Sequence, residues 1–490
     1  MKEAKTVIIK GDKCFYPSSE EWFRPSERYP EYLFKGCLAS GENHVYRMVR
    51  ESFYVMGLDV ENYGTGKWNP LKWFVKPGDK VVIKPNLVMN YNPSGDGTEC
   101  LYTQPSVVAP VIDYVLLALD GSGEIVVGDA PLQNCDFKKL VKTGGYGRLL
   151  QFYAGRTGNV KISLVDFREL KTKVVGNVYH QKISGKGSGI VVHLGEESEF
   201  YGKEDEYYRR LRVTNYDPKL MLEHHNAKCQ DYYVNREVLE ADVIINMPKP
   251  KTHRKAGVTV ALKNLVGINS RKEYLPHHTA GAKQAGGDEY LNVHSIKKIK
   301  SYLCDKRNVA ASEEKYGVVK CCNYLIKMVG LLIKFTQKDT FWEGSWYGND
   351  TISKTIVDLN KIIFYADKQG RIKKDKQRKY LIVADMVVSG EGEGPLMPSR
   401  KDVGIIAIGD NPVFFDKVIA KIMGADVRRI PSLWRAEQGN GNLLLKDYDA
   451  GVVLSNDVRW NHKTFEMLGR KEAIPYKPTD GWKKAWDRMR

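Results

Sequence analysis

The sequence has few features of a metal-cluster protein or a membrane protein. Its eight cysteines are spread over 490 residues without a C-x-x-C pair, so we expect neither a zinc ribbon nor an iron–sulfur cluster. No run of about 18 apolar residues occurs, and the N-terminus lacks the apolar core of a signal peptide. We therefore expect reduced thiols in a cytoplasmic protein that does not span a membrane.

Acidic residues are fewer than basic ones. The 59 Asp and Glu residues against 76 Lys and Arg residues give a net charge of +17, which favours anionic partners such as phosphorylated metabolites, an acidic membrane or nucleic acid. The sequence has no P-loop, which speaks against nucleotide triphosphate hydrolysis. It also has no RNA-stacking motif, so nucleic acid is an unlikely partner.

Strand and helix patterns alternate along the chain. Apolar β-branched runs at residues 80–84 and 124–128 flank a helical pattern at 104–119, which predicts a βαβ unit with parallel strands. Similar patterns return at 241–268 and 380–426. We predict an α/β fold: two lobes with mainly parallel twisted sheets flanked by helices. The expected parts are an N-terminal segment packed on the core (1–75), a first lobe (76–296), a helical insertion (297–346), a second lobe (347–470) and a C-terminal tail (471–490).

Polar side chains follow several of these expected strands. Ligands of open α/β sheets collect outside the carboxyl ends of the strands, so we expect one cleft lined by several loops. The expected ligand-binding residues are Lys84, Asn86, Asp129, Lys249, Lys251, Asn264, Asn349, Asp350, Glu391 and Asp410. Turn and helix-capping roles explain Asn349 and Asp350 equally well. Asp129, Asp410 and Asp416 could likewise contact hydroxyls, hold a divalent cation or cap turns.

The segment "NMPKPKTHRKAGVTVALKNLVGI" (246–268) is the strongest candidate for chemistry. Pro248 and Pro250 stiffen it, and Lys263 follows among apolar neighbours, where a buried lysine needs a partner, a ligand or a shifted pKa. A structural salt bridge or a surface position for Lys263 remains open. With His253 and His277 nearby, we expect these three residues to be catalytic. Candidate metal ligands are His253, His277, His278 and Asp129. A divalent metal is compatible with them, and no cofactor is identified.

The expected insertion contains a basic amphipathic helix. Lys320, Lys327 and Lys334 are seven residues apart and share one stripe. Such a helix either makes peripheral contact with an anionic membrane or packs on its own protein with the lysines facing water.

Six segments in order resemble the family named domain of unknown function 362. They are "VVIKPNLV", "VVGDAP", "ADVIINMPKPKTH…GVTVALKNLVGI…PHH", "WYGNDT…DLN", "GEGEGP" and "GDNPVFFDKVIAKIMG". Some members carry a ferredoxin module, from which the cysteine pattern here departs. Others occur among genes for cell-surface polysaccharide production, which implies sugar or nucleotide-sugar chemistry.

A more remote similarity, to the lactate racemase family with its nickel-pincer nucleotide, concerns His253, Lys263 and His277. It implies that Lys263 matches the cofactor-bearing lysine and that the two histidines are acid–base or metal-associated groups. Here "GVTVALKN" replaces the family's Gly-Gly-Arg-Lys type of turn.

Together these patterns predict an enzyme that acts on an anionic, phosphorylated or sugar-linked small molecule. Proton-transfer chemistry such as epimerisation or racemisation fits the lysine and histidines best. The alternative is a non-catalytic binding or assembly protein that docks on anionic lipid or nucleic acid through the lysine stripe and the basic run 371–379. The sequence does not determine the substrate or the oligomeric state.

Overall fold

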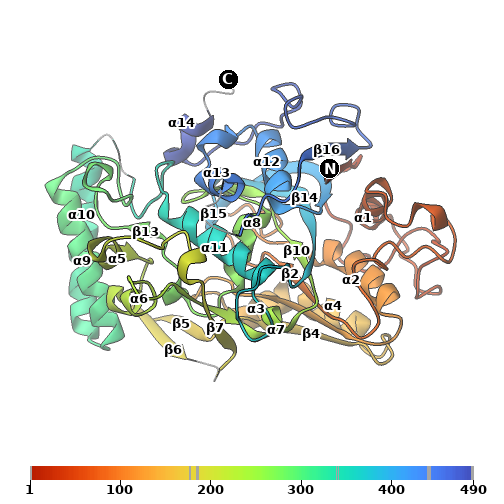
Figure 1. Ribbon diagram of the computed structural model, residues 1–490, viewed down its shortest axis with the longest axis horizontal. Helices are drawn as coiled ribbons and strands as arrows, with labels where there is room; N and C mark the ends of the chain where they lie inside the picture. Colours follow the sequence, from red (N-terminus) through yellow and green to blue (C-terminus); the bar gives the residue numbers. More distant parts are fainter. Residues whose placement is uncertain are drawn as a thin grey trace.

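A computed structural model describes residues 3–486 apart from 176–177, 184–186, 338, 340 and 439–442, and gives no side chains for 173–186. Its centre is a ten-stranded sheet (Figure 1). The strands of this sheet are β1 (Glu3–Lys10), β2 (Lys80–Pro85), β3 (Glu124–Asp129), β4 (Lys161–Asp166), β10 (Val243–Met247), β11 (Lys251–His253), β12 (Gly257–Thr259), β14 (Lys379–Glu393), β15 (Met397–Gly409) and β16 (Ala450–Ser455).

The main path of the sheet runs β16-β1-β15-β14-β10-β2-β3-β4. Neighbours are parallel except at β1–β15 and β15–β14. The expected βαβ unit is present, because β2 and β3 pair in parallel around a connecting helix. The predicted fold class is therefore confirmed. Strands of both expected lobes join in this one sheet, because β14 pairs with β10 along Val243–Asn246.

Helices cover both faces of the sheet. The α-helices are α1 (His44–Val55), α2 (Pro105–Leu119), α3 (Phe137–Thr143), α4 (Tyr146–Tyr153), α5 (Asp205–Arg209), α6 (Pro218–His224), α7 (Arg236–Glu240), α8 (Ala261–Asn264), α9 (Ser295–Ser312), α10 (Tyr316–Thr336), α11 (Thr351–Tyr365), α12 (Pro412–Ile422), α13 (Pro431–Gln438) and α14 (Lys483–Trp486). Short strands pair outside the main sheet: β5 (Leu170–Val175) with β6 (Val178–Ile183), β7 (Gly189–His193) with β9 (Asp231–Asn235), and β8 (Leu211–Arg212) with β13 (His278–Thr279). The 3-10 helices are η1 (Val60–Asn62), η2 (Gly195–Glu197), η3 (Leu265–Ile268), η4 (Lys272–Tyr274), η5 (Lys283–Ala285), η6 (Val427–Arg429) and η7 (Asp480–Trp482).

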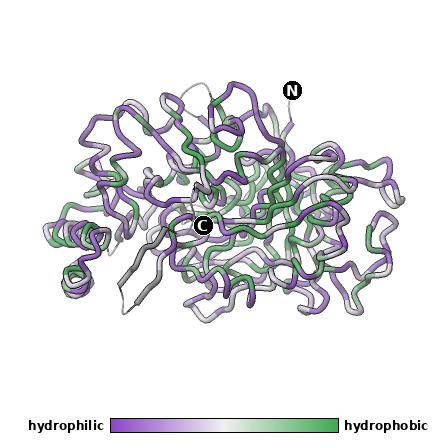
Figure 2. Tube along the Cα trace, turned by 90° about the horizontal axis from the view of Figure 1, so that it is seen from below, coloured by the Kyte–Doolittle hydropathy of each residue, from purple (hydrophilic) through white to green (hydrophobic). Residues whose placement is uncertain are grey.

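Two hydrophobic cores lie on opposite faces of the sheet. Successive side chains of a strand point to opposite faces, and β2 follows this rule: Val82 joins one core while Val81 and Ile83 join the other. Helices α11 and α12 contribute to the first core and α1 and α2 to the second. Figure 2 shows the hydrophobic chain segments gathered in the middle of the molecule. Because these strands are buried on both faces, their sequences are continuous runs of apolar residues.

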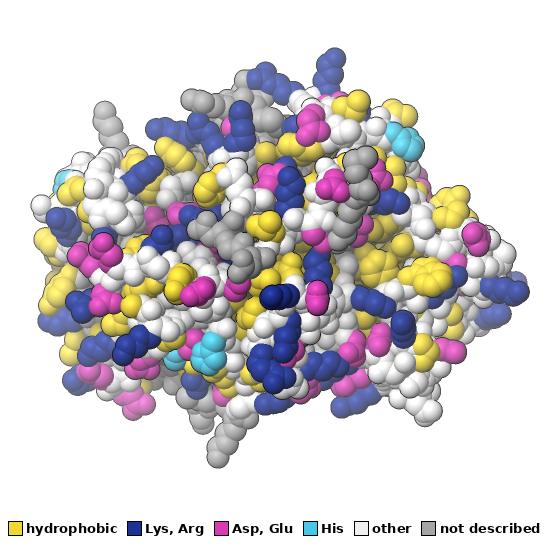
Figure 3. All heavy atoms as spheres, viewed as in Figure 1, with side chains coloured by type: hydrophobic (Ala, Val, Ile, Leu, Met, Phe, Trp, Pro, Cys, Tyr) yellow, Lys and Arg dark blue, Asp and Glu magenta, His cyan; other side chains and the backbone are white. Residues whose placement is uncertain are grey.

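Of two segments with distinctive sequence patterns, one differs from its pattern and one agrees with it. The glycines of "GEGEGP" favour a flexible loop, but Glu391 and Glu393 instead continue β14 and pair with β15. The insertion is helical, as expected, and consists of α9 and α10 side by side at one edge of the molecule (Figure 1). Among the described residues, no helix is long and apolar enough to cross a bilayer. Charged side chains of both signs are spread over the face seen in Figure 3.

Candidate functional site

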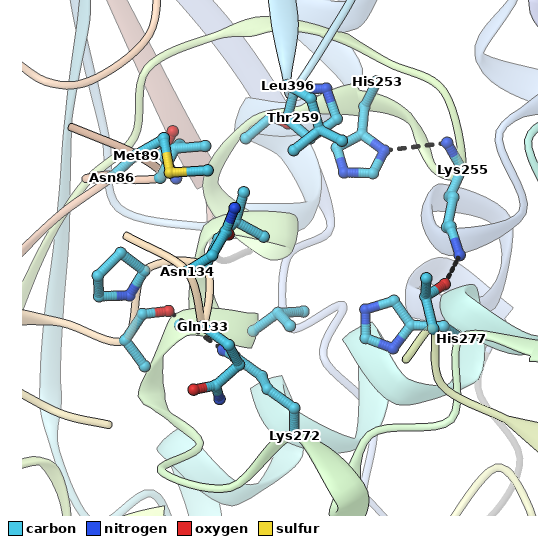
Figure 4. Close-up of a pocket in the computed structure, with 18 of the residues that line it drawn as sticks. Asn86, Met89, Gln133, Asn134, His253, Lys255, Thr259, Lys272, His277 and Leu396 are labelled. Carbon is cyan, nitrogen blue, oxygen red and sulfur yellow. Dashed lines mark hydrogen bonds between the residues drawn. The ribbon is translucent and has the colours of Figure 1, made fainter. Parts of the chain in front are cut away.

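A cavity of about 450 Å³ opens at the carboxyl ends of β2, β3 and β10. Its wall includes Asn86 just after β2, Asp129 at the end of β3, and Lys251 in β11. This is the edge where open α/β sheets bind ligands. Figure 4 shows Asn86, Met89, Gln133 and Asn134 on one side of the cavity, and His253, Lys255 and His277 on the other.

Seven of the residues expected from the sequence line this cavity. They are Asn86, Asp129, Lys251, His253, Lys263, Asn264 and His277. Strands, turns and a short helix separate them in the sequence, and the sheet edge brings them together. The expectation of one cleft lined by several loops agrees with this placement, while the roles of the individual residues stay predictions.

Lys263 projects from the short helix α8, which is held by hydrogen bonds from several other elements. Asp416 accepts the backbone N–H groups of Ala261 (2.8 Å) and Leu262 (3.0 Å) at the start of α8. Asn264 donates to Asn246 Oδ1 (2.7 Å), and Asn360 on α11 donates to the Leu262 carbonyl (3.0 Å). A side chain whose neighbours are held in this way is well positioned for a precise task.

A buried ion pair lies behind the cavity wall. Lys84 Nζ is 2.7 Å from Asp129 Oδ1, and Asp129 Oδ2 accepts the N–H of Leu87 at 2.8 Å. The pair leaves no room for a side chain at Gly267, because a Cβ there would lie 2.0 Å from Asp129 Oδ1 and 2.8 Å from Lys84 Nζ. Asp129 is thus already paired with Lys84, and its remaining attraction for Lys251, Lys263 and Lys272 is outweighed by the effect of burial on their pKa values.

Four lysines line the cavity without a carboxylate partner among the described residues: Lys251, Lys255, Lys263 and Lys272. We call them the cavity lysines. Three of them donate to neutral oxygens: Lys251 to Asn86 Oδ1 and the Leu101 carbonyl (both 2.5 Å), Lys255 to Thr214 Oγ1 (2.9 Å), and Lys272 to the Ala130 carbonyl (3.1 Å). Within the described part of the chain, the Lys263 ammonium has no hydrogen-bond or ion-pair partner.

Lys251 and Lys255 are buried, and Lys263 and Lys272 are half-buried, which makes the charged form of these lysines costly. Burial, with smaller effects from Lys272 and Lys84, lowers the pKa of Lys263 to about 7. Burial likewise lowers the pKa of Lys255 and of Lys272 to about 8 each. It holds the pKa of Lys251 well below its usual range, and the nearby Lys249 adds to this effect. The cavity is therefore poised to gain from an anion.

The two cavity histidines are held in opposite tautomers. His253 Nδ1 accepts the N–H groups of Lys255 and Ala256, both at 3.1 Å, so its proton resides on Nε2. His277 Nδ1 lies 2.6 Å from the Leu275 carbonyl and must donate to it, which leaves a lone pair on Nε2. Burial holds the pKa of both rings well below the usual histidine value, so both are neutral at pH 7. One ring can thus donate and the other accept.

Three expected residues outside the cavity lining support it from behind. Lys249 is buried in an ion pair with Asp385, at 2.8 Å, and also donates to the Tyr16 hydroxyl at 2.5 Å. Lys84 contacts the cavity residues Asp129 and Asn264. Asn349 donates to the His277 carbonyl at 3.0 Å and so helps to position that histidine.

The other expected residues lie outside the cavity lining. Asp350 pairs with Arg435 at 2.6 Å, Glu391 accepts the Lys477 N–H at 2.9 Å, and Asp410 accepts the Lys5 N–H at 3.0 Å. His278 is buried in the β8–β13 pair. Among the described residues, no three His, Cys, Asp or Glu side chains form a group that could hold a metal ion.

The basic run 371–379 is partly paired with acidic neighbours. Arg371 and Lys373 pair with Asp367 at 2.9 and 3.4 Å, and Lys376 pairs with Asp447. Arg378 is buried and donates to backbone carbonyls such as that of Ile363, at 3.1 Å. Docking of this surface on nucleic acid stays a prediction.

Sequence reasoning missed several lining residues, notably Lys255, Lys272, Gln133 and Asn134. Lys255 belongs to the basic segment already singled out, so its spacing from His253 was an available signal. Lys272 lies between Lys263 and His277 in the sequence and could have been included in the same window. Gln133 and Asn134 follow β3 beyond Pro131, where only the end of the strand was considered.

The fold and the site define an α/β protein with a cationic cavity at the carboxyl edge of a mostly parallel sheet. The chain matches the family model described as Domain of unknown function (DUF362) over residues 81–178 and 205–421. Because the match covers well over half of the chain, the protein belongs to this family. The matched ranges include His253, Lys263 and His277.

A curated relative comes from a cyanobacterial source, Synechocystis sp. (strain ATCC 27184 / PCC 6803 / Kazusa), and is named thylakoid-associated protein sll1697. It is 27% identical over 240 residues, which are 49% of this chain and 54% of the relative. The chain thus spans about half the length of this relative.

Proposed function

We propose that the protein is an enzyme that binds an anionic small molecule in the cavity and catalyses proton transfer on it. The observation that carries this proposal is the set of four cavity lysines without a carboxylate partner among the described residues. Burying several cations side by side is costly unless a counter-charge is present. A phosphate or carboxylate group of a ligand would supply that charge. The amides of Asn86, Gln133 and Asn134 suit hydroxyl groups of a sugar-like remainder.

The tautomers of the histidines support distinct roles in the reaction. His277 Nε2, with its lone pair, takes a proton from the substrate, and the electron pair of the broken bond stays on the substrate. His253 Nε2–H donates a hydrogen bond to the oxygen on which charge develops, as a neutral imidazole can. Lys263, with its pKa near 7, returns a proton as the general acid. The net change in the substrate is an isomerisation, which needs no oxidant or reductant. Exchange with solvent then removes the proton from His277 and returns one to Lys263.

Ligand binding can be tested by following the melting temperature of the protein with inorganic phosphate, malonate and a hexose phosphate. We expect stabilisation, and we expect Lys263→Met to weaken it about 10- to 100-fold, since a charge-assisted hydrogen bond contributes about 1.5–3 kcal/mol. Lys374→Met, at an exposed lysine, is the matched control. If none of these anions raised the melting temperature of the wild type, the proposal would be refuted.

Proton transfer can be tested separately in D₂O, where NMR detects the exchange of a carbon-bound proton in the ligand that stabilises most. We expect His277→Gln to retain anion binding and to slow exchange about 10²- to 10⁴-fold. If the wild type bound the ligand without any exchange of its protons, the protein would be a binding protein and the proposal of an enzyme would be refuted. The cytoplasmic location and a place in cell-surface polysaccharide metabolism stay predictions.

A further inference from the structure

Helix α10 has two apolar faces, and one of them is covered. Val319, Cys322 and Ile333 are buried, and their separations of three and eleven residues place them on one helix face. Helix α9 packs along α10 at the edge of the molecule, so these residues form the inner face of the hairpin (Figure 1). Polar contacts hold α9 to the body: Arg212 pairs with Asp305 at 3.0 Å, and Lys297 with Asp339 at 2.7 Å.

The other apolar face of α10 is exposed. It consists of Val318, Leu325, Met328, Leu332 and Phe335, which also recur every three or four residues, apart from one seven-residue step across Cys321. Leu332 is 51% exposed and Phe335 is 86% exposed. We call this set the outer face. A continuous exposed apolar surface of this kind marks an interaction site.

Lysines run along the edge of the outer face. Lys320, Lys327 and Lys334 are all exposed, and they lie three or four residues from Tyr324 and Leu331, two exposed apolar residues that adjoin Met328 on the helix surface. Helix α10 contains no Asp or Glu, so the helix itself offers these lysines no counter-charge. In Figure 3, hydrophobic side chains lie at the surface between Lys and Arg side chains along this edge.

We propose that α10 lies on an anionic lipid surface, with its outer face in the boundary between headgroups and acyl chains. An apolar face flanked by lysines is the pattern of an interfacial helix. The lysine stems can extend along the apolar boundary while the ammonium groups reach the lipid phosphates. A second copy of the chain fits less well, because two such helices would bring lysines together without an acidic residue from either α10. This inference concerns a different surface from the cavity and does not depend on the proposed reaction.

Sedimentation with vesicles tests the proposal. We expect the full chain to bind vesicles that contain phosphatidylglycerol, and to bind pure phosphatidylcholine vesicles or vesicles in high salt much less. Each lysine near the surface contributes about fivefold to affinity, so the triple variant Lys320→Gln, Lys327→Gln, Lys334→Gln should bind about 100-fold more weakly. Leu325→Asn, Met328→Asn, Leu332→Asn should weaken binding about tenfold or more.

Two control variants carry the same numbers of changes at other exposed positions. Lys35→Gln, Lys67→Gln, Lys138→Gln matches the charge change, and Trp73→Asn, Val458→Asn, Met467→Asn matches the loss of exposed apolar surface. Both should bind like the wild type, and melting curves should show that all variants fold. Equal binding by the wild type and both α10 variants would overturn the proposal. So would a dimer that dissociates in the apolar α10 variant without any change in vesicle binding, because α10 would then bind a second copy.

Discussion

Lys249 and Lys251 lie two residues apart, and both are 0% exposed, yet their surroundings are opposite. Lys249 pairs with Asp385 at 2.8 Å, whereas Lys251 meets only neutral oxygens and lines the cavity. The same contrast separates Lys84, which pairs with Asp129, from Lys263, which has no partner among the described residues. In the paired lysines a carboxylate offsets part of the cost of burial, while the cavity lysines lower the stability of the fold until an anion binds.

The sharpest test of this contrast removes one lysine from each set. Lys249→Met leaves Asp385 buried without its counter-charge, so we expect the free energy of unfolding to fall by about 3–5 kcal/mol. Lys263→Met leaves no carboxylate behind, and we expect a change of less than about 1 kcal/mol. Urea denaturation of both variants gives the two values. Equal losses in the two variants would show that the paired lysines and the cavity lysines do not differ in their effect on stability.

A smaller loss of stability is expected when a substitution in the cavity wall displaces the Lys84–Asp129 ion pair. In Gly267→Ala the new Cβ would lie 2.0 Å from Asp129 Oδ1 and must displace the Lys84–Asp129 pair. We expect a loss of about 1–3 kcal/mol in urea denaturation, with weaker stabilisation by phosphate.

Gly36→Ala is the control for this variant, because its Cβ would have no atom within 4 Å. Neither glycine has a positive φ, so the comparison isolates crowding from backbone conformation. If Gly267→Ala were as stable as Gly36→Ala, the ion pair would not be essential to this wall.

The strands beside the cavity could be predicted because each is a short apolar run bounded by turn residues, as in Lys80–Pro85 and Val243–Met247. The strand-end rule then placed Asn86, Asp129 and Lys251 near one another. It could not assign a different role to Lys249, because the Asp385 carboxylate comes from a strand far along the chain. The union of both expected lobes in one sheet also depends on long-range pairing of β10 with β14.

The position of Lys263 shows the same limit. The sequence indicated that Lys263 matters, since a lysine among apolar residues needs a reason. Its rigid turn depends on Asp416, which lies 155 residues from Ala261 in the sequence. Asp416 itself looked like a ligand-binding or turn-capping residue. Local patterns give the residue types near a site, and distant partners decide which side chains remain available for a ligand.

The pH dependence of stability offers a finer test of the cavity lysines. The pKa of Lys272 is about 8 in the folded protein, below the ordinary lysine value of 10.5. The unfolded chain therefore binds more protons between about pH 8 and pH 10.5, and folding becomes more favourable as the pH rises through this window. We expect the free energy of unfolding of the wild type, relative to Lys272→Met, to rise by about 1.7 kcal/mol from pH 8.5 to pH 10. Burial raises the pKa of cysteines such as Cys135 to about 12 in the folded protein, so they too affect stability in this range, but they are common to both proteins and cancel in the difference. Saturating phosphate should flatten the rise, because a bound anion keeps Lys272 protonated in the folded state. A difference that stays constant or falls with pH, measured without any anion, would mean that Lys272 carries its charge in the folded protein at little cost.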